Sequence, residues 1–230
     1  MDVEVTCTSE HMNFPVAIQD IGALPHELDG IIGLSFLNQF KSVEFDFRHN
    51  ELVLSKNAPR VIPSGIEVLS EADVKLCRLG VWSIDVTLDG RGPVKMLLDT
   101  GAASTYLNWP GVTNLNMNWN HPLISRNSHN LGAMGADNNA MALTHRFVAQ
   151  RWFQICAVTG SPIWLSNRGL DLKEMGPVNI DIGDLPVLEQ LKGEHVNGIL
   201  GNDLLMRCDL LRLTFSDASA TAALLIAKGD

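Results

Sequence analysis

Short runs of alternating apolar and polar residues, separated by Gly, Pro and Asn, make up most of the chain. This period of two predicts β-strands, which we expect over residues 3–8, 14–21, 43–47, 52–54, 81–88, 94–98, 141–147, 152–158 and 177–182. Glu44 and Asp46 alternate with apolar neighbours, which predicts a half-buried strand there. The dipeptide Asp89-Gly90 lies between two of the runs and predicts a two-residue hairpin turn. The pattern therefore predicts a chain built mainly of short strands.

One predicted strand, ending at residue 98, runs directly into Asp99-Thr100-Gly101-Ala102. Gly101 permits a sharp backbone turn, and the Thr100 hydroxyl can stabilise that turn. A carboxylate is costly to bury unless other groups hold it, so an acid at the end of a buried strand often has a chemical use. These four residues also fit a plain loop aspartate that caps its own turn, and by themselves they leave both interpretations open.

Composition and charge narrow the class of protein. The chain has 230 residues, of which 46% are hydrophobic and 19% charged, which is typical of a globular protein. A net charge of −9 argues against binding to nucleic acid or to an anionic membrane surface. No apolar run is long enough to span a membrane, and residues 1–5 do not resemble a signal peptide, so we expect an intracellular protein.

The cysteines and histidines predict neither a disulfide framework nor a metal site. The four cysteines are scattered without CxxC spacing, which fits reduced thiols in an intracellular protein; they are Cys7, Cys77, Cys156 and Cys208. Three histidines in polar segments lack the spacing of metal ligands: His121, His129 and His145. We therefore expect no metal and no other cofactor.

Two stretches of the chain are similar to one another. Residues 30–47, here called segment I, and residues 198–215, segment II, align without a gap over 18 positions, of which five are identical. The identical pairs are Gly30/Gly198, Ile31/Ile199, Gly33/Gly201, Leu37/Leu205 and Phe47/Phe215. Such an internal repeat indicates related structural units. We expect the second half of one unit, followed by a whole second unit.

Segment I itself has two parts with different expected structures. Its Gly-Ile-Ile-Gly at residues 30–33 predicts a buried strand whose glycines let another element approach closely. Residues 35–40 then suit a short helix with Phe36, Leu37 and Phe40 on one face. In segment II, Asp203 is expected to be a cap or a first-turn acid of the corresponding helix.

Residues 97–105, Leu-Leu-Asp-Thr-Gly-Ala-Ala-Ser-Thr, resemble the active-site loop of aspartic proteases, most closely of the retropepsin-like and DNA-damage-inducible type. In that family a hydrophobic pair precedes Asp-Thr-Gly-Ala, and a Thr usually follows three residues on, here Thr105. The family's second signature is Ile/Val-x-Gly-Ile-x-Gly followed by a short helix with Leu-Leu, which is similar to residues 196–205. Asp-Thr-Gly alone is a weak signal, but both signatures in this order are far more specific.

The resemblance implies an all-β fold, the pepsin/retropepsin-like acid protease barrel. Residues 78–230 would form one complete retropepsin-like lobe. Residues 1–56 would be the C-terminal part of a related first lobe whose Asp-Thr-Gly half is missing. Residues 57–77, which are rich in Pro, Ser, Gly and mixed polar residues, are expected to connect the two.

The resemblance also implies an aspartic endopeptidase that cleaves a peptide or protein substrate. In this family a water is activated between two aspartates, of which this chain holds Asp99. The mechanism needs a pair because two carboxylates a few ångströms apart cannot both ionise, so one activates the water and the other polarises the scissile carbonyl. Thr100, Gly101 and Ala102 would support the active-site loop. The candidate flap contains Gly132, Gly135 and Asp137.

The source of the second aspartate is left open by the sequence. Asp99 lies 102 residues before Gly201, so the corresponding aspartate for Gly33 would precede Met1. The chain is then a piece of a two-lobed protease, or it forms a homodimer in which Asp99 meets its symmetry mate. The alternative function is a catalytically incomplete, protease-like module for binding or dimerisation. In either case we expect little or no peptidase activity from the monomeric chain.

Overall fold

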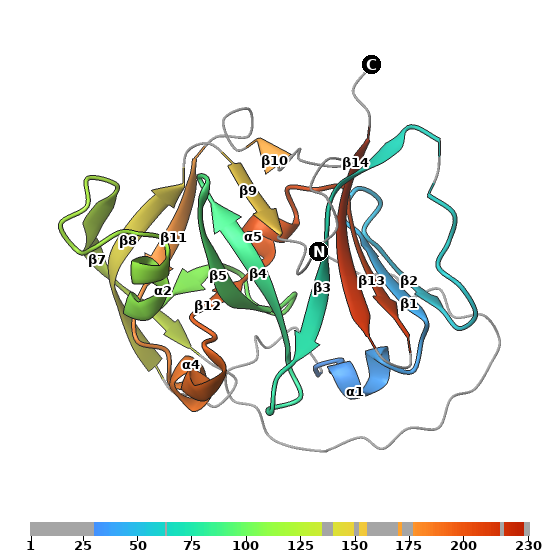
Figure 1. Ribbon diagram of the computed structural model, residues 1–230, viewed down its shortest axis with the longest axis horizontal. Coiled ribbons are helices and arrows are strands. Elements are labelled where there is room, and N and C mark those ends of the chain that lie inside the picture. The colour runs from blue at the N-terminus through green and yellow to red at the C-terminus, as the bar shows by residue number, and fades with distance from the viewer. Residues whose placement is uncertain are drawn as a thin grey trace.

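The computed structural model describes residues 30–62, 64–134, 140–149, 152–155, 170–171, 177–216 and 219–227, and these form mostly β-strands (Figure 1). The strands are β1 (Ser42–Asp46), β2 (Glu51–Ser55), β3 (Ile66–Leu76), β4 (Trp82–Leu88), β5 (Arg91–Leu98), β6 (Tyr106–Leu107), β7 (Ile124–Met134), β8 (Ala140–Ala149), β9 (Trp152–Ile155), β10 (Leu170–Asp171), β11 (Val178–Ile182), β12 (Gly198–Leu200), β13 (Leu210–Phe215) and β14 (Ala220–Ala227). The helices are short: α1 (Leu34–Leu37), α2 (Trp109–Asn114), α4 (Pro186–Gln190), the 3₁₀ turn η1 (Lys192–Glu194) and α5 (Asn202–Leu205). The predicted all-β character is confirmed.

Twelve of the described strands follow one continuous hydrogen-bonded path, in the order β2-β1-β13-β14-β3-β4-β5-β12-β6-β11-β8-β7, and β9, which pairs with β4 and β10, lies off this path. In Figure 1 the strands β1, β2, β13 and β14 lie on one side of β3, and β4, β5, β8 and β11 lie on the other. The sheet joins the two ends of the described chain, because β1 pairs with β13.

The expected connector, residues 57–77, contains the strand β3. Most of β3 pairs with β14, while Lys75 and Leu76 at its end pair with β4. The period-two signal is weak there because two of the buried positions are the small residues Ser70 and Ala72. Residues 66–76 therefore form a strand between β14 and β4, and the role of residues 57–77 as a connector between lobes stays a prediction.

The predicted hairpin at Asp89-Gly90 is confirmed. Both residues have positive φ, 51° and 71°, as a type I′ turn requires, and Leu88 pairs with Arg91 across it. This turn joins β4 to β5, the strand that leads to Asp99. Segment I does contain a short helix, α1, although it covers Leu34–Leu37 and not residues 35–40; Leu37 and Phe40 are buried and Phe36 is partly buried.

β1 and β13 come from aligned positions of segments I and II and pair antiparallel. Glu44 lies opposite Arg212, which is also its partner in the sequence alignment. On either side the register is symmetric: Ser42 faces Thr214, and Asp46 faces Leu210. The two strands are therefore related by a local two-fold axis that passes through the Glu44–Arg212 pair.

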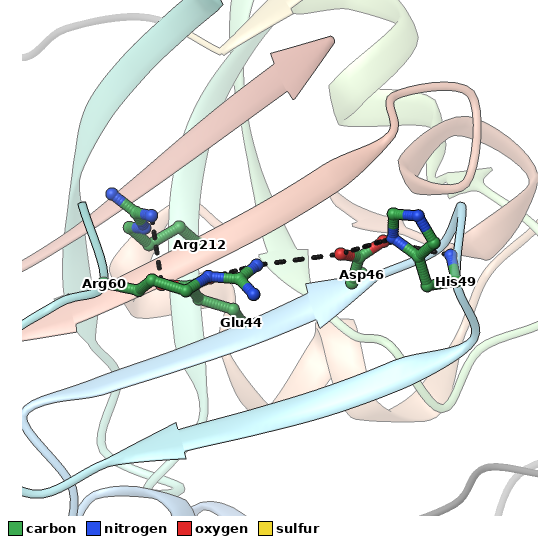
Figure 2. A network of polar contacts seen from close by, with 5 residues as sticks. All are labelled: Glu44, Asp46, His49, Arg60 and Arg212. Atoms are coloured by element: carbon green, nitrogen blue, oxygen red, sulfur yellow. Dashed lines mark hydrogen bonds and ion pairs between the residues drawn. The ribbon is translucent and has the colours of Figure 1, made fainter. Parts of the chain in front are cut away.

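The prediction that Glu44 and Asp46 lie on the solvent side of a half-buried strand is wrong. Glu44 is fully buried and Asp46 is 7% exposed. Buried carboxylates need cationic or hydrogen-bonding partners, and Figure 2 shows them. Glu44 lies between Arg212 Nη2, at 3.0 Å, and Arg60 Nη2, at 3.2 Å. The Asp46 carboxylate accepts a hydrogen bond from the His49 backbone N–H and a second contact from Nδ1 of the His49 ring, each at 3.0 Å.

The prediction of a buried strand at residues 30–33 is also wrong. These four residues are exposed and belong to no strand, whereas the aligned Gly198–Leu200 forms the buried strand β12. The difference has a physical cause, since a strand needs hydrogen-bonding neighbours. β12 has β5 and β6 as neighbours, while residues 30–33 have no strand partner among the described residues.

The main hydrophobic core lies between the strands and α2. Its largest fully buried side chains include Ile84, Leu88, Met96, Leu107, Leu115, Phe147, Ile180 and Ile182. Asn108 caps the N-terminus of α2, because its side-chain oxygen accepts the Gly111 N–H at 2.9 Å. Cys77 and Cys208 are buried free thiols. Within the described part of the chain, no helix has both the length and the apolar character needed to cross a membrane.

Candidate active site

The Asp99 loop joins two strands that share a common neighbour. β5 enters the loop, β6 leaves it, and β12 lies between them. β12 runs parallel to β5, with Leu98 beside Leu200, and antiparallel to β6, with Tyr106 opposite Ile199. This arrangement brings the two sequence signatures together although they are about a hundred residues apart, with Asp99 102 residues before Gly201.

The backbone of Asp99 is held at the end of this three-strand unit. Its N–H donates to the Leu200 carbonyl at 3.1 Å, which continues the β5–β12 pairing by one residue. Its carboxylate Oδ1 accepts the Gly101 N–H at 2.8 Å, and its carbonyl accepts the Ala102 N–H at 3.3 Å. The turn is therefore an Asx turn closed by the acid itself. Asp99 and Thr100 are half-buried, and Gly101 is exposed, so solvent reaches this loop.

Thr105 ties the far end of the loop to α5. The side chain is fully buried, and its hydroxyl makes two hydrogen bonds. It donates to Asp203 Oδ1 at 2.6 Å and accepts the Gly201 N–H at 3.1 Å. Asp203 lies in the first turn of α5, as the sequence predicted. Its role in this structure is to accept the Thr105 hydroxyl.

Asn202 provides a second connection between α5 and the loop. Its backbone N–H donates to the Ala102 carbonyl at 2.9 Å, and its side-chain Nδ2 donates to the Thr100 carbonyl at 2.7 Å. With the two bonds of Thr105, four hydrogen bonds hold residues 100–105 against residues 201–203. A loop held at so many points keeps its carboxylate in one position, which is what catalysis by a positioned acid requires.

Close packing against the loop and β6 explains the two glycines of segment II. A Cβ at Gly201 would overlap the Ser104 carbonyl. A Cβ at Gly198 would lie 2.7 Å from the Tyr106 carbonyl and 2.8 Å from Met96 Cε. The sequence predicted such a close approach at Gly30 and Gly33 of segment I, where no described backbone comes near; the structure shows it instead at the aligned glycines of segment II.

Two further polar groups lie next to the loop on β6 and β11. Burial raises the pKa of the Tyr106 phenol. A hydrogen bond with Ser104 lowers this pKa, and the nearby carboxylates of Asp181 and Asp203 raise it, so that the net shift is upward. Tyr106 is therefore a neutral hydroxyl at ordinary pH. Asp181 faces Tyr106 across the strand pair and forms an ion pair with Arg146 at 2.9 Å.

One of the three candidate flap residues lies on a described strand. Gly132 lies on β7, which pairs antiparallel with β8 up to Met134 opposite Ala140. Gly135 and Asp137 lie outside the described residues. The hairpin is connected to the site through the sheet, since β8 pairs with β11 and β11 pairs with β6. Its function as a flap stays a prediction.

Sequence reasoning identified the Asp99 loop and segment II, but it missed the residues that join them. The motif included Thr105 without a partner, and it left Asn202 without a role. A signal that could have pointed to them is Gly201, because a glycine allows another backbone to approach closely. The described residues contain no group of three or more His, Cys, Asp or Glu side chains placed to hold a metal ion.

No protein-family model matches the chain, and no curated protein matches it. Among solved structures, the chain is similar to a retropepsin-like aspartic protease from Rickettsia conorii. The match has a TM-score of 0.38 and 16% sequence identity, and it covers 74% of this chain and 100% of that chain. At this TM-score and sequence identity, the match does not show the role of any residue or the activity of this chain.

Proposed function

We propose that the chain is the Asp99-bearing part of an aspartic-type endopeptidase. The observation that carries this proposal is the Asp99 turn itself. A half-buried carboxylate sits at a strand end, its turn is closed through Gly101, and four hydrogen bonds fasten the following residues to α5. A plain surface turn has no need of such a framework, whereas a catalytic acid must be held in place.

In this proposal Asp99 works with a second aspartate across a bound water. Two carboxylates at close range share one proton, so the pair titrates as a unit. The ionised member takes a proton from the water, which attacks the scissile carbonyl, and the neutral member donates a hydrogen bond to the carbonyl oxygen. Thr100, Gly101 and Ala102 keep the loop in place. The β7–β8 hairpin, with Gly132, Gly135 and Asp137, would cover the substrate as a flap.

The second aspartate would come from a first lobe of which residues 1–56 are the C-terminal part. The β1–β13 pairing supports this source over a symmetric homodimer. In a dimer about the same axis, the β13 strand of a second copy would need the place next to β13. That place is filled by β1 of the same chain, so the dimer would have to displace it.

The alternative is a protease-like module that binds or dimerises without cleaving. It is favoured by one fact, since the chain contains a single Asp-Thr-Gly. The two functions differ in whether a form that contains two aspartate loops hydrolyses peptides.

The test is an assay with a quenched fluorescent peptide library at mildly acidic pH. It compares the 230-residue chain with the full translated reading frame that contains it, each as wild type and as Asp99→Asn. We expect cleavage by a form that holds two aspartate loops, inhibition by pepstatin, and a rate about 100- to 10,000-fold lower in Asp99→Asn. Asp89→Asn is the matched control, because it makes the same chemical change in a distant hairpin turn where Asn is well tolerated.

Two results would contradict the proposal. The first is cleavage that Asp99→Asn and pepstatin leave unchanged. The second is a folded form with two aspartate loops that cleaves nothing, which would support the binding module. Pepstatin-sensitive cleavage by a verified monomer of the 230-residue chain, lost in Asp99→Asn, would contradict the requirement for a second aspartate.

A further inference from the structure

The β7–β8 hairpin has two parts that differ in their neighbours. Near its base, residues 145–149 of β8 pair with β11, and residues 124–126 of β7 pair with β8. Farther out, residues 131–134 pair with residues 140–143, and this outer part, here called the ribbon, pairs with no other described strand. A two-stranded ribbon is only marginally stable by itself. Its direction therefore depends on what holds it at its base.

A bulge separates the ribbon from the base of the hairpin. The register shifts there, so that residues 127–130 of β7 lie opposite Thr144 alone. A bulge interrupts the backbone hydrogen bonds and bends the strand that carries it. The Asn127 side chain bridges the interruption, because its Nδ2 donates to the Leu143 carbonyl at 3.1 Å. The direction of the ribbon is thus set at this bulge.

Asp181 on β11 binds both strands of the hairpin at the bulge. Its Oδ1 accepts a hydrogen bond from Asn127 Nδ2 at 3.3 Å and another from Arg146 Nε at 2.9 Å. The Asp181 side chain is 11% exposed, and a carboxylate buried to this extent needs such partners. Gly183, two residues later, packs against β8, because a Cβ there would lie 2.8 Å from the Ala142 carbonyl oxygen. The base of the ribbon is therefore held closely against the end of β11.

The backbone of Asp181 belongs to the framework of the Asp99 loop. Its N–H donates to the Thr105 carbonyl at 3.3 Å, and the Thr105 hydroxyl is itself bonded to α5. In the parallel pairing of β11 with β6, Asp181 lies beside Tyr106. One residue thus contacts the loop framework through its backbone and the ribbon through its carboxylate.

We propose that Asp181 is a positioning residue for peptide cleavage, whose carboxylate sets the position of the ribbon relative to the Asp99 loop. It acts through Asn127 and Arg146 rather than on the reacting atoms. The inference rests on the proposed function, in which the β7–β8 hairpin covers the substrate. Loss of the carboxylate should loosen the ribbon and leave the Asp99 turn intact, since the hydrogen bonds of that turn use other groups.

The first test measures hydrogen exchange in the 230-residue chain and needs no activity. In Asp181→Ala we expect the amides of the ribbon to exchange at least about tenfold faster than in wild type, while those of residues 99–105 keep their rates. Asn127→Ala breaks the bonds of one strand and should speed exchange in the same amides; it carries the test if Asp181→Ala does not fold. Asp184→Ala is the matched control, because it makes the same change at an exposed position three residues away.

The second test measures peptidase kinetics in the form that holds two aspartate loops. We expect Asp181→Ala to raise KM at least about fivefold and to lower kcat less than about twofold, because substrate binding weakens while the Asp99 turn is unchanged. Asp181→Asn keeps an oxygen that can accept from Arg146 Nε, so it should restore most of the wild-type KM. Asp184→Ala should match wild type in both constants.

Three outcomes would overturn the proposal. They are unchanged exchange of the ribbon in both Asp181→Ala and Asn127→Ala, faster exchange that extends to residues 99–105, and a fall in kcat with KM unchanged. Failure of the proposed function would look different. Faster exchange confined to the ribbon, with no peptidase activity in any form, would reject the proposed function and leave the connection between Asp181 and the ribbon standing.

Discussion

Glu44 and Arg212 occupy the same position in segments I and II, face one another across β1 and β13, and form a buried ion pair with 3.0 Å between Oε1 and Nη2. A residue on a two-fold axis meets its own counterpart, so identical charges there would repel. The unlike charges favour pairing of β1 with β13. Pairing of two β13 strands would place one Arg212 against another, which disfavours symmetric association through this edge.

We expect Arg212→Met to lower the free energy of unfolding by about 3 kcal/mol, because it removes one partner of a carboxylate that is fully buried. Arg60→Met should cost about 1 kcal/mol or less, because the Arg60 side chain is 40% exposed and its ion pairs are screened by solvent. Urea denaturation of both variants measures the difference. If both variants lose the same free energy of unfolding, burial of the Glu44–Arg212 pair does not determine how much that pair stabilises the fold.

Thr105→Val keeps the shape of the side chain but removes the hydroxyl between Asp203 and the Gly201 N–H. We expect a loss of about 1–3 kcal/mol in unfolding free energy, since buried polar groups are left without partners. Thr105→Ser, which keeps the hydroxyl, is the control and should lose less. Combining Thr105→Val with Asp203→Ala should cost less than the sum of the single changes. Strict additivity in that cycle would show that the two side chains do not interact.

Gly201→Ala and Gly33→Ala make the same change at aligned positions. We expect Gly201→Ala to destabilise the fold by about 2–3 kcal/mol, because its Cβ overlaps the Ser104 carbonyl. Gly33→Ala should change stability by no more than about 0.5 kcal/mol, since the site is open. Thermal or urea unfolding of the two variants provides the measurement. A comparable loss in Gly33→Ala would mean that another part of the chain packs closely against residue 33.

Burial raises the pKa of the Cys208 thiol from 9.0 to about 12, and its Sγ donates a hydrogen bond to the Leu205 carbonyl at 2.8 Å. The unfolded chain ionises this thiol from pH 9.0 upward, while the folded chain keeps it neutral. Its contribution to stability is therefore complete below pH 9.0 and is lost as the pH rises toward 12. Between those values each pH unit should cost at most about 1.4 kcal/mol.

Urea denaturation at neutral pH and near pH 10 measures this loss. Cys208→Ala removes the thiol and should show a smaller decrease between the two conditions, whatever its stability at neutral pH. If wild type and variant lose the same amount, ionisation of Cys208 does not contribute to the alkaline decrease.

Local signals in the sequence predicted the Asp89-Gly90 turn, a short helix in segment I and half of the described strands, namely β1, β2, β4, β5, β8, β9 and β11. The strands predicted over residues 3–8 and 14–21 lie outside the described residues. Each of these signals depends on neighbours within a few residues, such as two positive φ angles or a period of two. The Asp99 motif could be identified for the same reason, since a turn and its acid are contiguous. The hydrogen bonds that hold this loop against α5 could not be predicted. The Thr105–Asp203 bond, for example, joins residues 98 positions apart, and nothing in the spacing predicts that contact.

By itself, the amino-acid sequence established a mainly β chain, two similar segments and one acid placed at a strand end. Burial and pairing depended on tertiary contacts. Gly-Ile-x-Gly is a buried strand at residues 198–201 and an exposed stretch at residues 30–33, because only the former has β5 and β6 beside it. Glu44 is buried because Arg212 and Arg60 neutralise it. A local pattern encodes what a segment can form, and its distant neighbours determine whether the hydrogen bonds and charges of that segment are satisfied.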